Sequence, residues 1–199
     1  LSSCLSGEIQ EEKFYFWTGS GGNGKSKLVE LIDHSLGEYS GSLDVAFLTS
    51  KRGCSSSASP ELENVKNCRF VSMSEPEKED VVYSGKLKQM SGGDKMTSRG
   101  LFKDTKRFKP QFKIILMCND LPKLAGNDGG IWRRIEVVNY IAKFSDNPRP
   151  CEADPYQYLA DEKLSSKLEE WKLLFMIKLL EKYTIYCVEG TNPPKEVKN

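Results

Sequence analysis

The chain has 199 residues, of which 38% are hydrophobic and 29% are charged, and its formal net charge is +1. This length suits one α/β domain with a small addition, and the hydrophobic fraction excludes a largely disordered chain. The near-zero charge excludes a uniformly basic nucleic-acid binder, so binding to nucleic acid would have to rest on local clusters of charge.

The cysteines and the apolar runs exclude two further classes of protein. None of the six cysteines forms a C-x-x-C pair, and the chain has one histidine, His34, so no structural zinc site is expected. We interpret the cysteines as free thiols in a reducing compartment. There is no signal-peptide pattern, and the longest apolar run, residues 173–177, is too short to span a bilayer.

The first predicted elements are a strand, a glycine-rich loop and a helix. Residues 13–18, KFYFWT, predict a buried strand, and residues 25–37, KSKLVELIDHSLG, predict a helix that ends at Gly37. Between them, GSGGNGKS at residues 19–26 fits the pattern G-x-x-x-x-G-K-[ST]. Phosphate-binding loops lie between a strand and a helix, so the context favours one here over an ordinary glycine-rich turn.

The remaining elements alternate between strands and helices. Residues 49–60 predict a mobile loop, residues 61–67 a short helix, and residues 145–156 a turn-rich linker. Strands are expected within residues 68–75, 112–122 and 130–141, and a long amphipathic helix over residues 162–186. This order predicts an α/β fold with a mainly parallel central sheet flanked by helices. Because ligands bind at the carboxyl edge of such sheets, we expect the loop, Glu75 and Asn119 to share that edge.

The residue types of the loop suit a nucleoside triphosphate. Its glycines let the backbone take positive φ and approach phosphates, and its N–H groups and the helix amino end attract anions. Lys25 would reach the β- and γ-phosphates of ATP, and Ser26 would ligate Mg²⁺. The nucleotide-binding residues are therefore predicted to be Gly19, Ser20, Gly21, Gly22, Asn23, Gly24, Lys25 and Ser26.

Polar residues follow two other predicted strands. Glu75 ends FVSMSE and would polarise water or hold Mg²⁺ through water, with Glu77 as a second candidate. Asn119 follows KIILMC and would bond the γ-phosphate or the attacking water. The alternatives are a solvated acidic turn for the glutamates and a turn cap for Asn119.

Residues 86–113 hold nine basic and two acidic side chains, with three phenylalanines among them. Such a segment can follow a phosphate backbone and stack the bases of single-stranded nucleic acid, although a solvated basic face is the common alternative. Residues 97–110, TSRGLFKDTKRFKP, also have hairpin character. The predicted nucleic-acid contacts, which the resemblance described below would make DNA contacts, are Lys95, Arg99, Lys103, Lys106 and Arg107.

Two adjacent arginines, Arg133 and Arg134, follow the glycine-rich AGNDGGIW. An arginine that reaches a neighbouring subunit's site can stabilise transition-state charge. The alternative is a structural ion pair. Because neighbouring residues of a strand point to opposite sides, only one of the two is expected to act in this way.

Several segments occur in a familiar order, and together they resemble the superfamily 3 helicase domain of phage and plasmid primases and of poxvirus and giant-virus primase-helicases. These segments are FYFWTGSGGNGKSKLVELI, RFVSMSEPE, LKQMSGGDKMTSRGLFKD, FKPQFKIILMCNDLP and GGIWRRI. The resemblance covers residues 1–145. It implies a RecA/AAA+-like ATPase that forms a ring, usually a hexamer, and moves on DNA with 3′→5′ polarity.

The resemblance also implies roles for the residues. Residues 19–26 correspond to the Walker A loop, Glu75 to the Walker B acid, and Asn119 to the polar sensor. Residues 92–109 correspond to a hairpin with DNA-contacting lysines, for which Lys103 and Lys106 are the best candidates, and Arg133 and Arg134 correspond to the arginine pair. Ser74 departs from the pattern, because many relatives have a second acid there. That departure leaves Mg²⁺ to Ser26 and Glu75, with Glu77 as an additional candidate.

The resulting expectation is an ATPase domain over residues 1–145 and a linker with a C-terminal helical segment over residues 146–199. ATP and Mg²⁺ would be its ligands, and single-stranded DNA and further copies of itself its partners. We expect no membrane association, a primase module elsewhere in a longer polypeptide, and a location in the host cytoplasm (a viral factory) or nucleus. A P-loop enzyme of another class, such as a small-molecule kinase, and a nucleic-acid-binding module with a decayed ATP site remain the alternatives.

Overall fold

The computed structural model describes residues 1–50, 60–100, 104–126 and 129–197. Its helices are η1 (Ser2–Ser6), α1 (Lys25–Leu36), η2 (Gly37–Tyr39), α2 (Ala46–Thr49), α3 (Pro60–Val65), α4 (Ser84–Ser91), α5 (Gly129–Trp132) and α6 (Leu164–Glu189). Its strands are β1 (Phe14–Thr18), β2 (Ser40–Ser42), β3 (Phe70–Met73), β4 (Val81–Tyr83), β5 (Met96–Ser98), β6 (Lys106–Phe108), β7 (Lys113–Met117), β8 (Lys123–Ala125), β9 (Ile135–Asn139), β10 (Lys143–Ser145) and β11 (Gln157–Leu159).

The centre of the molecule is a five-stranded sheet in the order β2-β3-β7-β1-β9, in which every neighbouring pair is parallel. The mixed α/β class, the mainly parallel sheet and the C-terminal helix predicted from the sequence are thus confirmed. Strand β7 lies between β1 and β3. The segments that follow these three strands therefore leave the sheet side by side, at its carboxyl edge.

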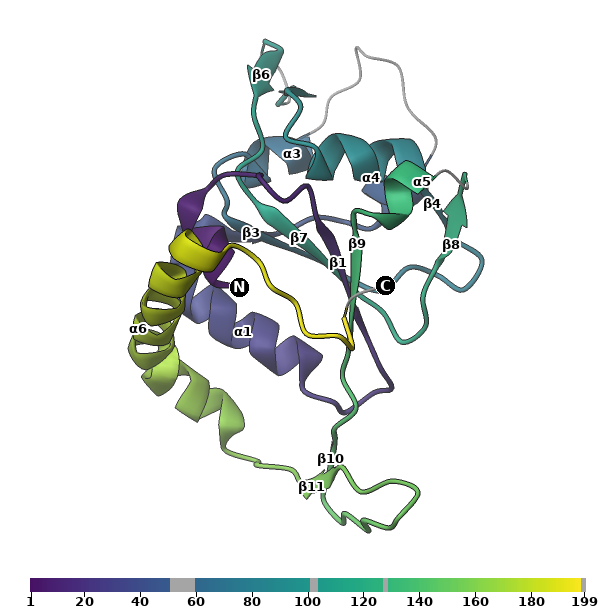
Figure 1. Ribbon diagram of the computed structural model, residues 1–199, viewed down its shortest axis with the longest axis vertical. Coiled ribbons are helices and arrows are strands. Elements are labelled where there is room, and N and C mark those ends of the chain that lie inside the picture. Colours follow the sequence, from purple (N-terminus) through teal and green to yellow (C-terminus); the bar gives the residue numbers. More distant parts are fainter. Residues whose placement is uncertain (51–59, 101–103, 127–128, 198–199) are drawn as a thin grey trace.

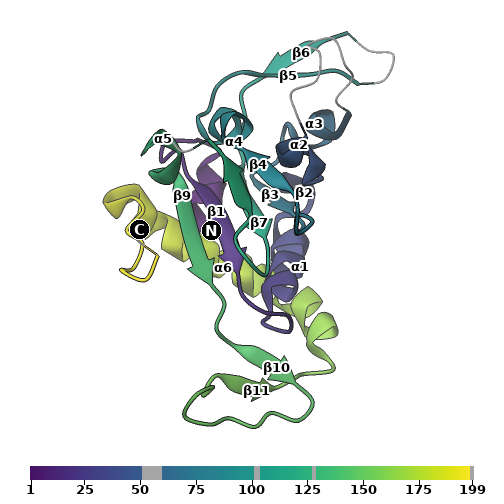
Figure 2. The ribbon, with the colours of Figure 1, turned by 90° about the vertical axis from the view of Figure 1, so that its right-hand side faces the viewer.

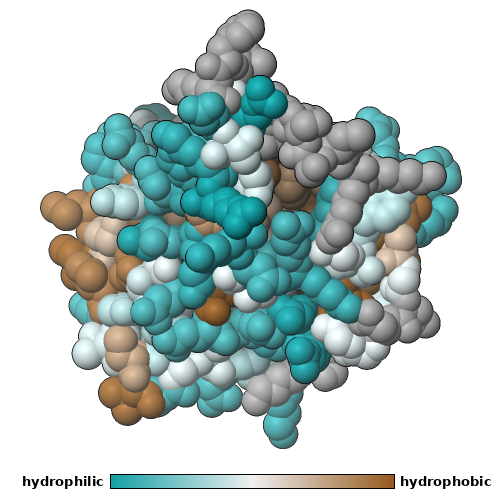
Figure 3. Space-filling view, turned by 90° about the horizontal axis from the view of Figure 1, so that it is seen from above, coloured by the Kyte–Doolittle hydropathy of each residue, from teal (hydrophilic) through white to brown (hydrophobic). Residues whose placement is uncertain are grey.

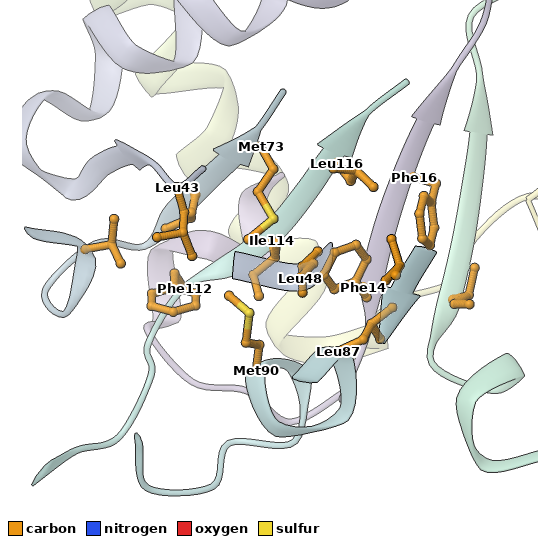
Figure 4. Packing of buried hydrophobic residues seen from close by; sticks show 14 of the residues in the cluster. Phe14, Phe16, Leu43, Leu48, Met73, Leu87, Met90, Phe112, Ile114 and Leu116 are labelled. Carbon is orange, nitrogen blue, oxygen red and sulfur yellow. The ribbon is translucent and has the colours of Figure 1, made fainter. Parts of the chain in front are cut away.

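The two faces of the sheet carry separate layers of helices. Alternate residues of a strand point to opposite faces. Phe14 and Phe16 of β1 pack with side chains of α2, α3 and α4, and Figure 4 shows this core beside Leu48, Leu87 and Met90. Trp17 packs on the other face, with the buried side chains of α1 and with η1.

The long C-terminal helix lies against α1 on the second face, as Figures 1 and 2 show. His34 Nδ1 lies 2.8 Å from a carboxylate oxygen of Glu169, which joins the two helices at their surface. Helix α6 buries few of its own apolar residues: Leu168 and Leu179 are buried, whereas Leu173 is 69% exposed. Among the described helices, none is at once long and apolar enough to cross a bilayer.

Within the described residues, three two-stranded sheets surround the central one. Strands β4 and β8 pair in parallel, β5 and β6 pair antiparallel as the predicted hairpin requires, and β10 and β11 pair in parallel. The last pair was not predicted; its strands flank residues 145–156, the predicted turn-rich linker, and share only Ser145 with that segment. The mobile loop predicted for residues 49–60 falls mostly outside the described residues. Seen from the end that carries β5 and β6, the surface is largely hydrophilic (Figure 3).

Buried polar groups connect α6 to the start of β7. The ammonium of Lys113, which is 4% exposed, donates to Glu8 O at 2.9 Å and pairs with the carboxylate of Glu11. The hydroxyl of Tyr186 in α6 donates to the other oxygen of Glu11. Burial raises the pKa of Glu11, but the hydrogen bonds from Lys113 and Tyr186 outweigh it, so that this pKa is lowered.

We predict that Glu11→Gln lowers the free energy of unfolding at neutral pH by about 1–2 kcal/mol, because the ammonium of Lys113 loses its counter-charge. A carboxylate whose pKa is lower in the folded than in the unfolded state stabilises the fold at pH values above its unfolded-state pKa. This stabilisation is lost as the pH falls through the folded-state pKa. The difference from the unaltered chain should therefore shrink in acid. Urea unfolding of both proteins at a series of pH values measures this difference in the free energy of unfolding. Glu152→Gln, at an exposed position, is the control. A loss that does not change with pH would contradict this account.

Candidate active site

The glycine-rich loop joins β1 to α1 and has the backbone that its sequence demands. Gly19 has φ 131°, and a Cβ built on it would lie 2.5 Å from the carbonyl oxygen of Tyr140. Only glycine meets both conditions. Gly22 (φ 74°) and Gly24 (φ 87°) also have positive φ. The expectation of positive φ at Gly21 is wrong: its φ is not positive, and a Cβ there would meet nothing within 4 Å.

The lysine of the loop is held inside it. Lys25 is 8% exposed, and its ammonium donates to Gly19 O at 2.5 Å. Loss of solvent lowers the pKa of Lys25, and the negative charges of its surroundings, Glu75 among them, oppose this. A desolvated ammonium with few acceptors is a strong site for an anion, because an anion would restore the interactions that water no longer supplies.

Two other loop residues differ in burial. Asn23 is 5% exposed; its Oδ1 accepts from Lys25 N–H at 3.4 Å, while its Nδ2 has no hydrogen-bond partner among the described residues. Ser26, in the first turn of α1, is exposed. Its hydroxyl therefore faces solvent at the amino end of a helix, where anions and the metals that accompany them bind.

Glu75 and Asn119 meet at the carboxyl edge of the sheet. The backbone N–H of Asn119 donates to Glu75 Oε1 at 2.7 Å, and its side-chain amide donates to Oε2 at 2.9 Å. The carbonyl oxygen of Asn119 accepts from Gly19 N–H at 3.4 Å. The structure thus brings the loop, Glu75 and Asn119 together. Both glutamate and asparagine are exposed, so water and ligand can reach them.

This arrangement fits a polyphosphate with a divalent cation. The loop offers N–H groups and a buried ammonium to anionic oxygens, and the hydroxyl of Ser26 and the carboxylate of Glu75 are oxygen donors of the kind that Mg²⁺ takes. Each carboxylate oxygen has two acceptor sites, so Glu75 can still accept a proton from water while it is bonded to Asn119. Ser74 beside it is exposed and contributes no charge.

The arginine pair does not lie at this edge. Arg133 and Arg134 stand between α5 and β9, before the amino end of β9, whereas the loop follows the carboxyl end of the neighbouring β1 (Figure 1). Arg134 is largely enclosed and pairs with Glu12 at 2.9 Å; its Nε and Nη1 are buried without a hydrogen-bond partner in the described part of the chain. The side chain of Arg133 is 69% exposed, 3.8 Å from Glu12. Neither arginine can reach the loop of its own chain.

The predicted DNA contacts gather on and beside the β5–β6 pair. Lys95, Arg99, Lys106 and Arg107 are all exposed, and Lys103 lies outside the described residues. In β6, Lys106 stands opposite Ser98, which donates to Glu63, while Arg107 stands opposite the exposed Thr97. The charge of Lys106 helps to lower the pKa of Glu63, after the larger effects of hydrogen bonds from Lys66 and Ser98. Arg107 is therefore on the face of the pair that points away from α3.

Two residues of the basic segment are structural. Lys86 is 8% exposed and donates to Phe47 O at 2.6 Å and to the hydroxyl of Ser50 at 3.0 Å. Lys113 belongs to the buried cluster with Glu11. The count of basic residues in the sequence therefore overstates the charge that this segment presents to a partner.

The segment after β9 contacts the loop, which the sequence did not predict. Tyr140 N–H donates to Thr18 O at 2.8 Å, and its ring lies 5.4 Å from that of Trp17. Phe144 N–H donates to Gly22 O at 2.7 Å. The one sequence signal is the apolar character of YIAKF, residues 140–144, in which only Lys143 is charged, immediately before the turn-rich stretch.

Residues 17–134 match the family described as "Family of unknown function (DUF5906)". A protein of Acanthamoeba polyphaga mimivirus, named as a candidate helicase, is 44% identical and covers 99% of this chain. A candidate helicase of Frog virus 3 is 32% identical over 90% of the chain, and a candidate primase of African swine fever virus is 26% identical over 92%. The matches cover 21%, 19% and 20% of these relatives, so the chain spans about one fifth of their length.

Solved structures of the NrS-1 C-terminal region share the fold. One has a TM-score of 0.61 with 16% identity, over 89% of this chain and 40% of that one; another has a TM-score of 0.60 with 15% identity, over 85% and 36%. The family match spans more than half of the chain. It includes the whole glycine-rich loop, residues 19–26, and the arginine pair. The chain therefore belongs to the family described as DUF5906, and its viral relatives confirm the resemblance to the superfamily 3 primase-helicases.

Proposed function

We propose that the chain is the ATP-hydrolysing motor domain of a viral primase-helicase, a P-loop ATPase of the RecA/AAA+ kind that moves single-stranded DNA during replication. The observation that carries this proposal is the meeting of three strand ends at one edge, where Lys25, Glu75 and Asn119 converge. Relatives named as helicases and primases support the choice of a replication motor over a small-molecule kinase.

Hydrolysis of ATP needs a positioned phosphate and a positioned water. In this proposal the Walker A loop and Lys25 hold the β- and γ-phosphates, and the ammonium exchanges Gly19 O for phosphate oxygen. Glu75 orients the attacking water and accepts its proton. Asn119, bonded to both oxygens of Glu75, fixes the carboxylate and contacts the γ-phosphate or water as the sensor.

Mg²⁺ would be held by Ser26 directly and by Glu75 through water, and it would neutralise charge on the phosphates. Ser74 supplies no second carboxylate, so the protein offers the metal a sparse set of ligands. Glu77 lies in a turn that its backbone closes with Asp80. We therefore assign the catalytic role to Glu75 alone.

The position of the arginines favours a shared site. An arginine before β9 of one subunit can act only in the nucleotide site of another, which requires an oligomer, a hexameric ring in this proposal. Arg133 is the better candidate because it is exposed, whereas Arg134 is enclosed and paired with Glu12. The enclosure of Arg134 and its ion pair with Glu12 are typical of a residue that stabilises the fold.

The β5–β6 pair supplies the DNA contact in this proposal. It lies at the opposite end of the molecule from the nucleotide loop (Figure 1), as expected if hydrolysis at one end drives movement of DNA at the other. Its exposed cations, Lys95, Arg99, Lys106 and Arg107, would follow the phosphate backbone, together with Lys103. A primase module in the same polypeptide, and a site of action in the cytoplasmic viral factory or the nucleus, complete the proposal.

ATP turnover by the oligomeric protein tests the nucleotide site. We expect Lys25→Ala to abolish phosphate release, and Glu75→Gln to lower kcat about 100-fold or more while ATP still binds, because only the general base is lost. Lys27→Ala, one helix position beyond Ser26 with a half-exposed side chain that bonds Glu30 and Ser165, and Glu77→Gln are the controls and should turn over normally. Unchanged turnover in Lys25→Ala would end the motor interpretation.

Mixed oligomers test the arginine. Arg133→Ala should leave the free energy of unfolding within about 0.5 kcal/mol and lower turnover about 1,000-fold, whereas Arg134→Ala should cost about 1–3 kcal/mol. Equal amounts of Arg133→Ala and Lys25→Ala subunits, each inactive alone, should recover about a quarter of the activity, because random assembly joins an intact loop to an intact arginine at that frequency. No recovery in a stable mixed ring would refute action between subunits.

Binding of single-stranded DNA tests the β5–β6 pair. Arg107→Ala should weaken binding and reduce the slope of log K against log salt by about 0.7, the value for one phosphate contact on a single strand. Lys106→Ala should have the smaller effect, because Lys106 stands opposite Ser98, on the face of the pair that turns toward Glu63 of α3. Lys178→Ala, an exposed lysine of α6, serves as the control. Identical affinity and slope in all three variants would show that DNA binds elsewhere.

A further inference from the structure

We infer that Phe144 and Tyr158 form a stacking platform for the base of the nucleoside triphosphate whose phosphates occupy the loop. The inference rests on the proposed function and deepens it, because the residues assigned so far contact only phosphates, metal and water. Strands β10 and β11, which carry the two rings, lie beyond the carboxyl edge of the sheet, next to the start of α1 (Figures 1 and 2).

The first support is direct contact between Phe144 and the loop. Its N–H donates to Gly22 O at 2.7 Å, and its own carbonyl oxygen would lie 3.2 Å from a Cβ at Gly22. Its ring carbon Cε2 would lie 3.6 Å from a Cβ at Gly24, the residue that caps α1. The ring therefore borders the amino end of α1, where the phosphates are held, and a base joined to them by one ribose lies within its reach.

The second support is that both rings are exposed although they are large and apolar. Phe144 and Tyr158 face each other across the β10–β11 register, with ring centroids 5.6 Å apart and planes inclined by 33°. They remain 43% and 48% exposed. Two adjacent aromatic rings that keep this much open surface are suited to stacking a third planar group.

The third support is that the backbone holds the platform in place. Lys143 N–H donates to Tyr156 O and Ala160 N–H donates to Ser145 O, both at 2.9 Å, so the strands are bonded at each end. The side chain of Gln157 accepts from Arg149 N–H at 3.1 Å and donates to Asp154 at 2.9 Å, which braces the turn between them. A preorganised platform loses little entropy when a base stacks on it.

Stacking identifies the class of ligand and its selectivity. An aromatic face binds any base, because every base has a π-face, and it reads no hydrogen-bonding edge. The ligand is therefore a nucleoside triphosphate, with purines favoured modestly over pyrimidines by their larger surface. If Phe144 only supported the structure of the loop, it would contribute equally to the affinity for every phosphate compound.

Affinities for Mg-ATP and for inorganic tripolyphosphate with Mg²⁺, measured by calorimetry on the same protein, separate these roles. Phe144→Ala and Phe144→Leu should bind ATP about tenfold more weakly and tripolyphosphate as the unaltered protein does. The leucine variant keeps an apolar side chain against Gly24, so the fold and the loop are preserved. Phe144→Trp should retain ATP affinity, and Tyr158→Ala should show an intermediate loss.

Tyr156→Ala, 46% exposed in the same segment but outside the ring pair, is the control and should leave both affinities unchanged. If Phe144→Leu weakened the binding of ATP and of tripolyphosphate equally, Phe144 would have only a structural role in the loop. That result would overturn the inference and leave the proposed nucleotide site intact. Unchanged ATP affinity in both Phe144→Leu and Tyr158→Ala would overturn it as well. An unaltered protein that binds neither compound would overturn the proposed function and the platform together.

Discussion

One asparagine holds the site together. Asn119 donates two hydrogen bonds to the carboxylate of Glu75 and accepts one from Gly19, so it joins the ends of three strands. It can do so because β7 lies between β1 and β3 in a fully parallel sheet, which releases all three chain segments at the same edge. The strand order decides the geometry of the site, and the buried core on both faces of the sheet keeps that order fixed.

The two edges of the sheet differ in the chemistry that they expose. The carboxyl edge offers a desolvated ammonium at Lys25 and an open carboxylate at Glu75, whereas the amino edge carries the exposed guanidinium of Arg133. Groups that would act on one nucleotide therefore stand on opposite sides of a single chain. Such a division is stable in a monomer because each charged group is solvated or paired where it stands. In the proposed oligomer, it would become a complete site only where two copies meet.

Local patterns predicted the elements, and long-range packing decided the rest. The strand, loop and helix around residues 14–36 follow from apolar spacing and glycine, which act within a few residues. The burial of Lys86 depends on α2, and the enclosure of Arg134 depends on Glu12, contacts that no spacing reveals. Residues 145–156 have the composition of a linker, and they connect β10 to β11, a pair of strands that local composition does not reveal. The place of β10 beside the loop depends on the hydrogen bond from Phe144 N–H to Gly22 O.

The contact between β10 and the loop changes how the motif itself should be read. In G-x-x-x-x-G-K-[ST] the residue before Asn23 is free to vary, but here Gly22 has positive φ and lies against the carbonyl oxygen of Phe144. Gly21, beside it, meets neither restriction. Mutational tolerance within the loop is thus uneven, and the amino acid allowed at position 22 is tied to a strand more than a hundred residues away. A side chain introduced at position 22 should therefore displace the backbone of β10 at Phe144, whereas one at position 21 should not.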